Sequence, residues 1–149
     1  MTRTRRATVA MLLVGLAIFS SLYSTQAILP TLVRNMGLSS TAAAMTVSAA
    51  TGALALCVVP ASILSERFGR GRILLISAVA ATGVGLIVPL AQEGWQLIVV
   101  RGLQGALLSG APATAMAWLS EELDDKALPR AMGLYIVGTS VGGLTGRLI

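Results

Sequence analysis

The chain has 149 residues, of which 55% are hydrophobic and 11% are charged, and its formal net charge at pH 7 is +5. A soluble domain carries roughly twice this charged fraction, so the composition argues against an ordinary soluble domain and predicts an all-α, polytopic membrane protein. The sequence has no histidine and one cysteine, Cys57, which excludes a histidine-ligated metal site, a Ser-His-Asp triad and an internal disulfide. We therefore predict that the chain is not an enzyme and binds no metal or cofactor.

Apolar blocks follow one another along the chain, each close to the ~20 residues that cross ~30 Å of hydrocarbon as a helix. We expect one transmembrane helical bundle, a single domain over residues 1–149. Its five predicted spans are Ala7–Ile28, Thr41–Leu64, Ile73–Ala91, Gln96–Leu119 and Pro129–Ile149.

The first block follows the basic segment "MTRTRR" and also resembles a secretory signal with Ala27 before the cleavage site. The block is longer than a typical signal core and four more blocks follow, so an uncleaved first helix is the preferred interpretation. Near its end, Tyr23 and Gln26 lie three residues apart and are expected on one helix face. They either line a polar cavity or hydrogen-bond a neighbouring helix.

Basic residues cluster on one side of the predicted membrane. They precede the first block, separate the second from the third, and return before the fifth at Lys126 and Arg130, whereas the opposite side carries only Arg34. The positive-inside rule then places the N-terminus in the cytoplasm of a bacterial inner-membrane protein. The excess positive charge is therefore attributed to topology, and no nucleic-acid partner is expected.

The loop between the second and third blocks reads "SERFGRGR". Glu66 and Arg70 are four residues apart, so one helical turn can pair them, but an exposed pair contributes only ~0.3–0.5 kcal/mol. Gly69 and Gly71 permit a tight turn into the next helix. The loop therefore either orients the helices as a solvated turn or has a role beyond static stability.

The fourth block contains a cation inside a predicted span. Arg101 is followed on the same face by Gln104 and Gly105, and Pro112 is expected to kink the helix further along. Arg101 either extends to the lipid headgroups or faces inward beside a water-filled path, with Gln104 as a hydrogen-bonding neighbour.

The fifth block has glycines at four-residue spacing, Gly138, Gly142 and Gly146, with Gly143 beside them. Such a stripe lets two helix backbones approach closely, and the spacing leaves open whether the contact is static or sliding. Arg147, near the end of this block, is expected to extend to the headgroups. Five spans leave the last residue outside, and we expect the chain to be the N-terminal part of a longer polypeptide.

The three polar segments together resemble the signatures of the major facilitator superfamily. In the loop, Leu64, Arg67, Gly69 and Arg70 match that family's loop motif, whereas Ser62, Glu66 and Gly71 replace its usual glycine, aspartate and second basic residue. "RGLQG" resembles its Arg-x-x-Gln-Gly motif at Arg101, Gln104 and Gly105, and "GLYIVGTSVGGLTGRLI" resembles the glycine-rich motif of its exporter branch, without the usual proline. The nearest likeness is to YnfM-like, arabinose-efflux or drug–proton antiporter carriers.

This resemblance implies five spans of a twelve-span carrier that works by alternating access. It implies a gating role for the loop, in which Glu66 latches to a missing second half and Arg72 belongs to the same basic cluster. It also implies that Arg101, with Gln104 and Gly105, serves coupling or the cavity, which Tyr23 and Gln26 line.

The expected function is proton-coupled efflux of a small organic molecule by a carrier that is monomeric when complete. The alternatives are an uptake symporter for sugars or metabolites and a non-transporting receptor or assembly subunit. No Asp or Glu lies mid-span, so a coupling carboxylate is expected outside this chain.

Overall fold

The computed structural model describes residues 3–148, and the side chains of residues 4–28, 30–31 and 33–148. Helices fill almost all of this range and no strand occurs in it, which confirms the all-α class. The elements are α1 Arg3–Tyr23, α2 Thr25–Met36, α3 Ser40–Phe68, α4 Arg70–Ile87, the 3₁₀ turn η1 Val88–Leu90, α5 Gly94–Leu108, α6 Gly110–Glu122 and α7 Leu128–Leu148. Ile149, the last residue of the fifth predicted span, lies outside the described residues.

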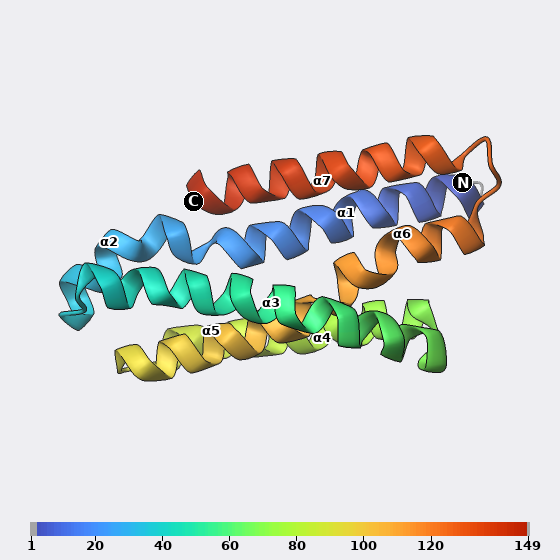
Figure 1. Cartoon of the computed structure of the whole chain (residues 1–149). Helices are drawn as coiled ribbons and strands as arrows, with labels where there is room; N and C mark the ends of the chain where they lie inside the picture. The colour runs from blue at the N-terminus through green and yellow to red at the C-terminus, as the bar shows by residue number, and fades with distance from the viewer. Residues whose placement is uncertain (1–2, 149) are drawn as a thin grey trace.

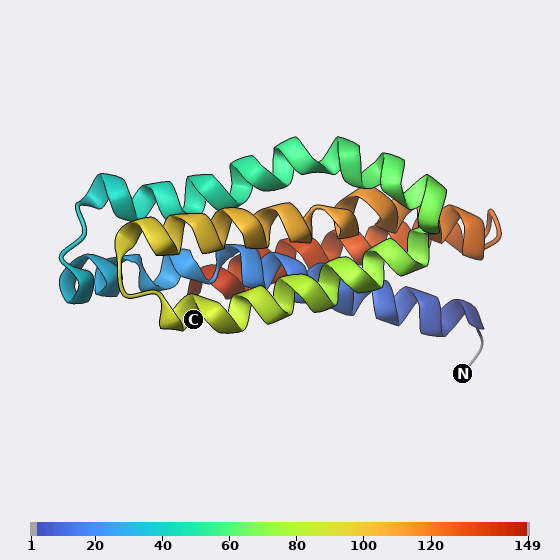
Figure 2. The same ribbon diagram turned by 90° about the horizontal axis from the view of Figure 1, so that it is seen from below.

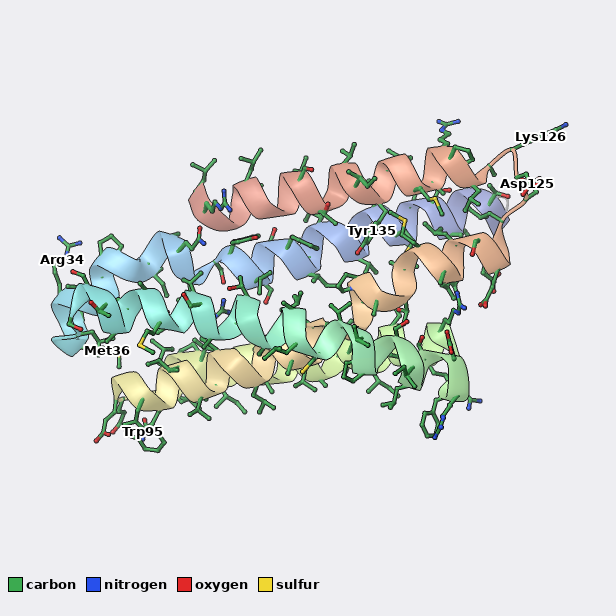
Figure 3. All side chains as sticks on the ribbon, viewed as in Figure 1. Arg34, Met36, Trp95, Asp125, Lys126 and Tyr135 are labelled. Atoms are coloured by element: carbon green, nitrogen blue, oxygen red, sulfur yellow. The ribbon has the colours of Figure 1, made fainter. Side chains whose placement is uncertain are left out.

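The helices run along one long axis and turn back at the two ends of the bundle (Figures 1 and 2). The N-terminus, the α3–α4 turn and the α6–α7 loop share one end. Arg34, Met36 and Trp95 lie at the other end, away from Asp125 and Lys126 (Figure 3). The basic segments that the sequence assigns to one side of the membrane therefore share one end of the bundle.

Among the described residues, three helical segments are long and apolar enough to cross a membrane: Thr4–Ile28, Ser40–Phe68 and Arg70–Leu90. The fourth predicted span is divided between α5 and α6, of 15 and 13 residues, each shorter than the ~20 that a crossing requires. That α5 and α6 together form one crossing, and α7 another, therefore remains a prediction. Large apolar side chains on the outer surface, such as Leu56 (79% exposed) and Leu86 (74%), suit a lipid environment.

Two boundaries between helices fall at single serines, both of which keep helical backbone angles. Ser24 separates α1 from α2, and Ser109 separates α5 from α6. The second boundary follows from Pro112, which has no N–H to donate to the carbonyl of Leu108, where α5 ends. The helix boundary therefore lies at Ser109, three residues before Pro112. Pro60, by contrast, lies inside α3 without interrupting it.

The glycine stripe of α7 packs directly on the backbone of α1. Gly138, Gly142 and Gly146 are buried, and each faces a carbonyl oxygen of α1, those of Leu12, Leu16 and Ser20 respectively. A Cβ added at Gly146 would lie 2.5 Å from the Ser20 carbonyl, so only glycine fits this crossing. Gly143 is different, since an added Cβ would meet the Tyr23 ring at an ordinary 3.5 Å.

Polar side chains reinforce the same α1–α7 contact. The Ser20 hydroxyl donates to the carbonyl of Gly142 at 3.0 Å and lies 2.9 Å from the Thr145 hydroxyl. Backbone contact and interhelical hydrogen bonds are the forces that hold helices together when lipid removes the hydrophobic drive between them. A second close pair, α3 and α5, meets where Gly105 faces the backbone of Ala50.

Candidate functional site

The main polar cluster inside the bundle is built around Arg101 of α5. This side chain is only 1% exposed. One guanidinium nitrogen donates to Gln104 Oε1 at 2.6 Å and to the carbonyl of Ser21 at 3.3 Å, and the other terminal nitrogen donates to the carbonyl of Leu22. The structure therefore places Arg101 in the interior and not at the headgroups.

The end of α1 explains why a cation can be buried at this position. Because α1 ends at Tyr23, the carbonyls of Ser21 and Leu22 belong to its last turn, where backbone donors become fewer. The Ser21 carbonyl also accepts from the Ser24 hydroxyl at 3.0 Å. Arg101 supplies N–H groups to both, and its positive charge also complements the negative end of the helix dipole. Arg101 thus joins α5 to the end of α1.

Gln104 completes the connection between the two helices. Its Oε1 accepts from Arg101, and its Nε2 donates to the Ser21 hydroxyl at 3.0 Å. Among the described buried atoms, Arg101 Nε is left without a hydrogen-bond partner. Ser21 is a member of this cluster that sequence reasoning missed, because a small hydroxyl in an apolar block looks like ordinary helix packing.

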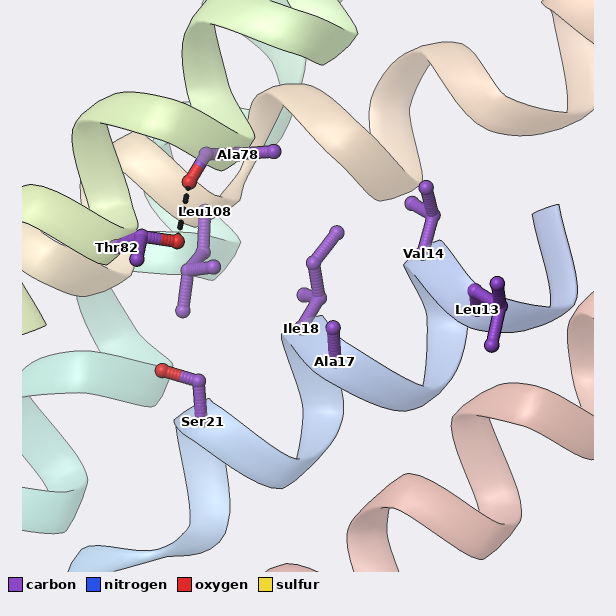
Figure 4. Close-up of a pocket in the computed structure, with 8 residues that line it drawn as sticks. All are labelled: Leu13, Val14, Ala17, Ile18, Ser21, Ala78, Thr82 and Leu108. Atoms are coloured by element: carbon purple, nitrogen blue, oxygen red, sulfur yellow. Dashed lines mark hydrogen bonds between the residues drawn. The ribbon is translucent and has the colours of Figure 1, made fainter. Parts of the chain in front are cut away.

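Two adjoining pockets lie between α1 and α4. One, of about 530 Å³, has Arg101 and Gln104 in its wall and extends to α2 and η1. The other, of about 230 Å³, is mostly apolar (Figure 4). Ala17, Ser21 and Thr82 line both, so the two pockets form one continuous groove along α1.

The cavity roles of Gly105 and Gln26 stay predictions. Gly105 faces the backbone of Ala50 on α3, so its small size serves close helix packing. Gln26 lies on α2, beyond the boundary at Ser24, whereas Tyr23 belongs to α1. Ser24 between them keeps helical backbone angles (φ −54°, ψ −34°), and its N–H donates to the carbonyl of Ser20 at 2.9 Å. That Tyr23 and Gln26 share one helix face therefore stays a prediction.

Tyr23 instead faces α7. The guanidinium carbon of Arg147 lies 4.5 Å from the centre of the Tyr23 ring. The centres of the Phe19 and Tyr23 rings are 6.3 Å apart. These side chains line a pocket of about 290 Å³ with Thr139 and Ser140. Arg147 therefore stacks on an aromatic face. The prediction that Arg147 extends to the lipid headgroups did not include this contact.

The loop between α3 and α4 turns at a single residue. Gly69 has φ +95°, a conformation that L side chains rarely adopt, and its N–H donates to the carbonyl of Ser65 at 3.0 Å. Gly71 has an ordinary helical conformation and lies against Trp118, whose Nε1 would be 3.2 Å from an added Cβ. The turn therefore needs Gly69, while Gly71 leaves room for an indole of α6.

Arg70 pairs with a different acid from the one suggested by spacing. Its Nε lies 3.1 Å from Glu121 Oε1 at the end of α6. Glu66 is on α3 and Arg70 starts α4, so the turn at Gly69 removes the helical i, i+4 relationship between them. Leu64, Glu66, Arg67 and Arg72 are all exposed around this turn.

Comparison with known proteins now decides the family. The model of the Major Facilitator Superfamily matches residues 11–149. The chain belongs to the major facilitator superfamily. No solved structure matches the chain.

Relatives that are similar in sequence come from several bacteria. The chain is 35% identical over 144 residues to "Inner membrane transport protein YnfM" of Escherichia coli, which covers 97% of this chain and 34% of that protein. It is 36% identical over 145 residues to "Uncharacterized MFS-type transporter YybF" of Bacillus subtilis, with 97% and 36% covered. A shorter match, 36% over 86 residues, joins it to "Multidrug resistance protein MdtG" of Proteus mirabilis.

The chain spans about a third of the length of the first two relatives. Membership of the superfamily and the apolar helices make it a multi-pass bacterial inner-membrane protein of a transporter family. The loop motif, the Arg101 motif and the glycine-rich helix α7 lie within the matched range.

Proposed function

We propose that the chain works in a secondary transporter that exports small organic molecules in exchange for protons by alternating access. The observation that carries this proposal is the buried Arg101, which joins α5 to the end of α1 beside a polar groove. A cation in the interior of a membrane bundle costs free energy, so its presence favours a role in transport. The name of MdtG, a multidrug resistance protein, supports export.

In this proposal Arg101 and Gln104 form the coupling element. The contacts between α5 and α1 are hydrogen bonds to two backbone carbonyls and one hydroxyl, which a small rotation of either helix breaks. A cation with one unpartnered nitrogen also attracts an anionic group that enters the groove. The titrating carboxylate is expected in the part of the relatives that this chain does not cover.

The α3–α4 turn serves as the gate in the same proposal. Arg70 is held by Glu121, which fixes the turn to the end of α6. Glu66 is exposed beside it and can reach a second half of the transporter. We expect Leu64, Glu66, Arg67, Gly69, Arg70 and Arg72 to move as one unit when the cytoplasmic side opens, with the N-terminus in the cytoplasm.

The test uses inside-out vesicles from the native membrane, prepared from cells with and without the gene for this protein. Vesicles are energised, and the pH gradient is followed by quenching of an acridine dye while amphipathic cations, organic acids and sugars are added in turn. Export by proton exchange predicts that at least one compound collapses the gradient only when the gene is present. A compound that enters right-side-out vesicles together with protons would instead establish uptake, and no gene-dependent transport of either kind would refute transport.

Variants at the coupling element separate transport from folding. Arg101→Gln, introduced into the native gene, is expected to abolish gene-dependent transport while the protein still reaches the membrane. Exposed Arg34 at the opposite end of the bundle provides the matched control, and Arg34→Gln is expected to transport normally. Equal activity of the two variants would remove Arg101 from the mechanism.

A further inference from the structure

A basic pocket of about 740 Å³ lies at the end of the bundle that holds the N-terminus. It is formed by the first turns of α1, the α6–α7 loop and the beginning of α7, segments that meet beside the N-terminus in Figure 1. Lys126 lies on this loop, at the same end of the bundle in Figure 3. The pocket is separate from the Arg101 groove and from the α3–α4 turn.

Cations from three positions line this pocket: Arg5, Lys126 and Arg130. Among the described side chains, no carboxylate lies within ion-pair distance of any of the three. The wall contains one acid, Asp124, whose carboxylate already accepts from the N–H of Ala127 at 3.0 Å. Like charges held together without partners repel one another, so the pocket favours a ligand that carries negative charge.

The apolar part of the wall indicates what kind of anion fits. Val9 and Leu134 also line the pocket, and both lie further into their helices than the cations of the same helices, Arg5 and Arg130. The span that begins at Thr4 starts at this level, so the pocket crosses the boundary between polar and apolar surroundings. A free phosphate would use only the charged part, whereas an amphipathic anion would use both.

We propose that this pocket binds the headgroup of an anionic phospholipid. The phosphate lies among Arg5, Lys126 and Arg130, and the upper part of an acyl chain lies along Val9 and Leu134. The positive-inside rule explains basic residues at this end of the bundle, but it does not require residues about 120 positions apart to converge on one concave site with an apolar wall. A bound lipid would join the start of α1 to the start of α7.

The experiment measures lipid binding by native mass spectrometry of the purified chain in detergent. Phosphatidylglycerol and phosphatidylethanolamine with the same acyl chains are titrated in parallel, since both carry a phosphate but only the first has a net charge. We expect phosphatidylglycerol to bind with a dissociation constant at least fivefold lower. Each neutralised cation is expected to weaken its binding by about fivefold, the equivalent of ~1 kcal/mol per basic residue near an anionic surface.

Variants at the basic residues and at Asp124 change the charge of the pocket in opposite directions. Arg5→Gln/Arg130→Gln is expected to weaken phosphatidylglycerol binding strongly, while Arg34→Gln leaves it unchanged. Asp124→Asn keeps the oxygen that accepts from Ala127 and removes a negative charge, so it is expected to strengthen binding; this gain cannot arise from misfolding. Equal binding in the double variant and the Arg34 control, or no gain in Asp124→Asn, would overturn the proposal.

A competition arm identifies the source of the phosphate. Inorganic phosphate and glycerol 3-phosphate are added at millimolar concentration to the lipid-bound chain. Retention of phosphatidylglycerol supports the lipid site, because the small anions lack the contacts to Val9 and Leu134. Complete displacement would show a site for free phosphate and would reject the lipid.

Discussion

Arg101 of α5 donates to the carbonyl oxygen of Leu22, so the first helix ends on a cation supplied 79 residues later in the chain. The relationship is mutual: the Leu22 carbonyl in the last turn of α1 needs a donor, and a buried guanidinium requires acceptors. Each group therefore satisfies the other in the interior. This contact explains how a polar junction between two helices persists inside an apolar bundle.

Removal of the guanidinium should therefore destabilise the bundle. In Arg101→Met the apolar volume is roughly kept, but the Leu22 carbonyl and Gln104 Oε1 lose a donor, while the Ser21 carbonyl keeps the Ser24 hydroxyl. We expect the free energy of unfolding to fall by about 1–3 kcal/mol for each acceptor left without a partner. The measurement is thermal unfolding in detergent, followed by circular dichroism.

Arg34→Met is the control for this loss, since Arg34 is exposed in the last turn of α2. Its effect should be limited to the small favourable interaction of a cation with a helix end, ~0.3–1 kcal/mol. If Arg101→Met were no less stable than Arg34→Met, the contact with α1 would be without energetic consequence.

The glycine stripe of α7 predicts substitutions of opposite sign within one helix. A Cβ at Gly142 would collide with the carbonyl of Leu16, so Gly142→Ala must push α7 away from α1. Overpacking of this kind costs about 1–3 kcal/mol. Gly133 has open space at the same atom, so Gly133→Ala should stabilise the helix by ~0.5–1 kcal/mol. Unfolding midpoints of the two variants that shift in the same direction would contradict the crossing described above.

The turn between α3 and α4 predicts strain at one glycine only. Gly69→Ala places a Cβ on a residue with φ +95° and ψ 129°, which costs about 1–3 kcal/mol. Gly52→Ala, on the exposed face of α3 with open space around it, should be neutral or stabilising. Chemical unfolding of both variants in mixed micelles measures the difference. Equal stability would show that the turn tolerates a side chain.

The Arg70–Glu121 ion pair predicts a coupling that Glu66 does not share. A double-mutant cycle of Arg70→Gln and Glu121→Gln should give a coupling free energy of about 0.2–1 kcal/mol, because both side chains are partly exposed. The parallel cycle with Glu66→Gln should give a value near zero. Coupling in the first cycle should fall as salt is raised. A larger coupling to Glu66 would restore the pairing that sequence spacing suggests.

The sequence by itself determined the class of the protein and the positions of most helices. Apolar blocks of membrane-crossing length, the clustering of basic residues at one end and the turn at Gly69 are local properties, so they can be recognised without knowing which helices meet. The stripe of Gly138, Gly142 and Gly146 likewise predicts a close helix contact, although it does not indicate which helix is contacted.

Only the tertiary structure decided which side chains meet. Pairing of α1 with α7 and of α3 with α5 depends on how each helix is rotated and where it crosses its neighbour, and periodicity within one helix does not specify either. For this reason the sequence shows that Arg101 is unusual but not which groups of α1 it contacts, and spacing allows Glu66 to pair with Arg70, which pairs with Glu121. The donation from Arg101 to the carbonyl of Leu22, 79 residues earlier in the chain, is likewise a contact that no local pattern specifies.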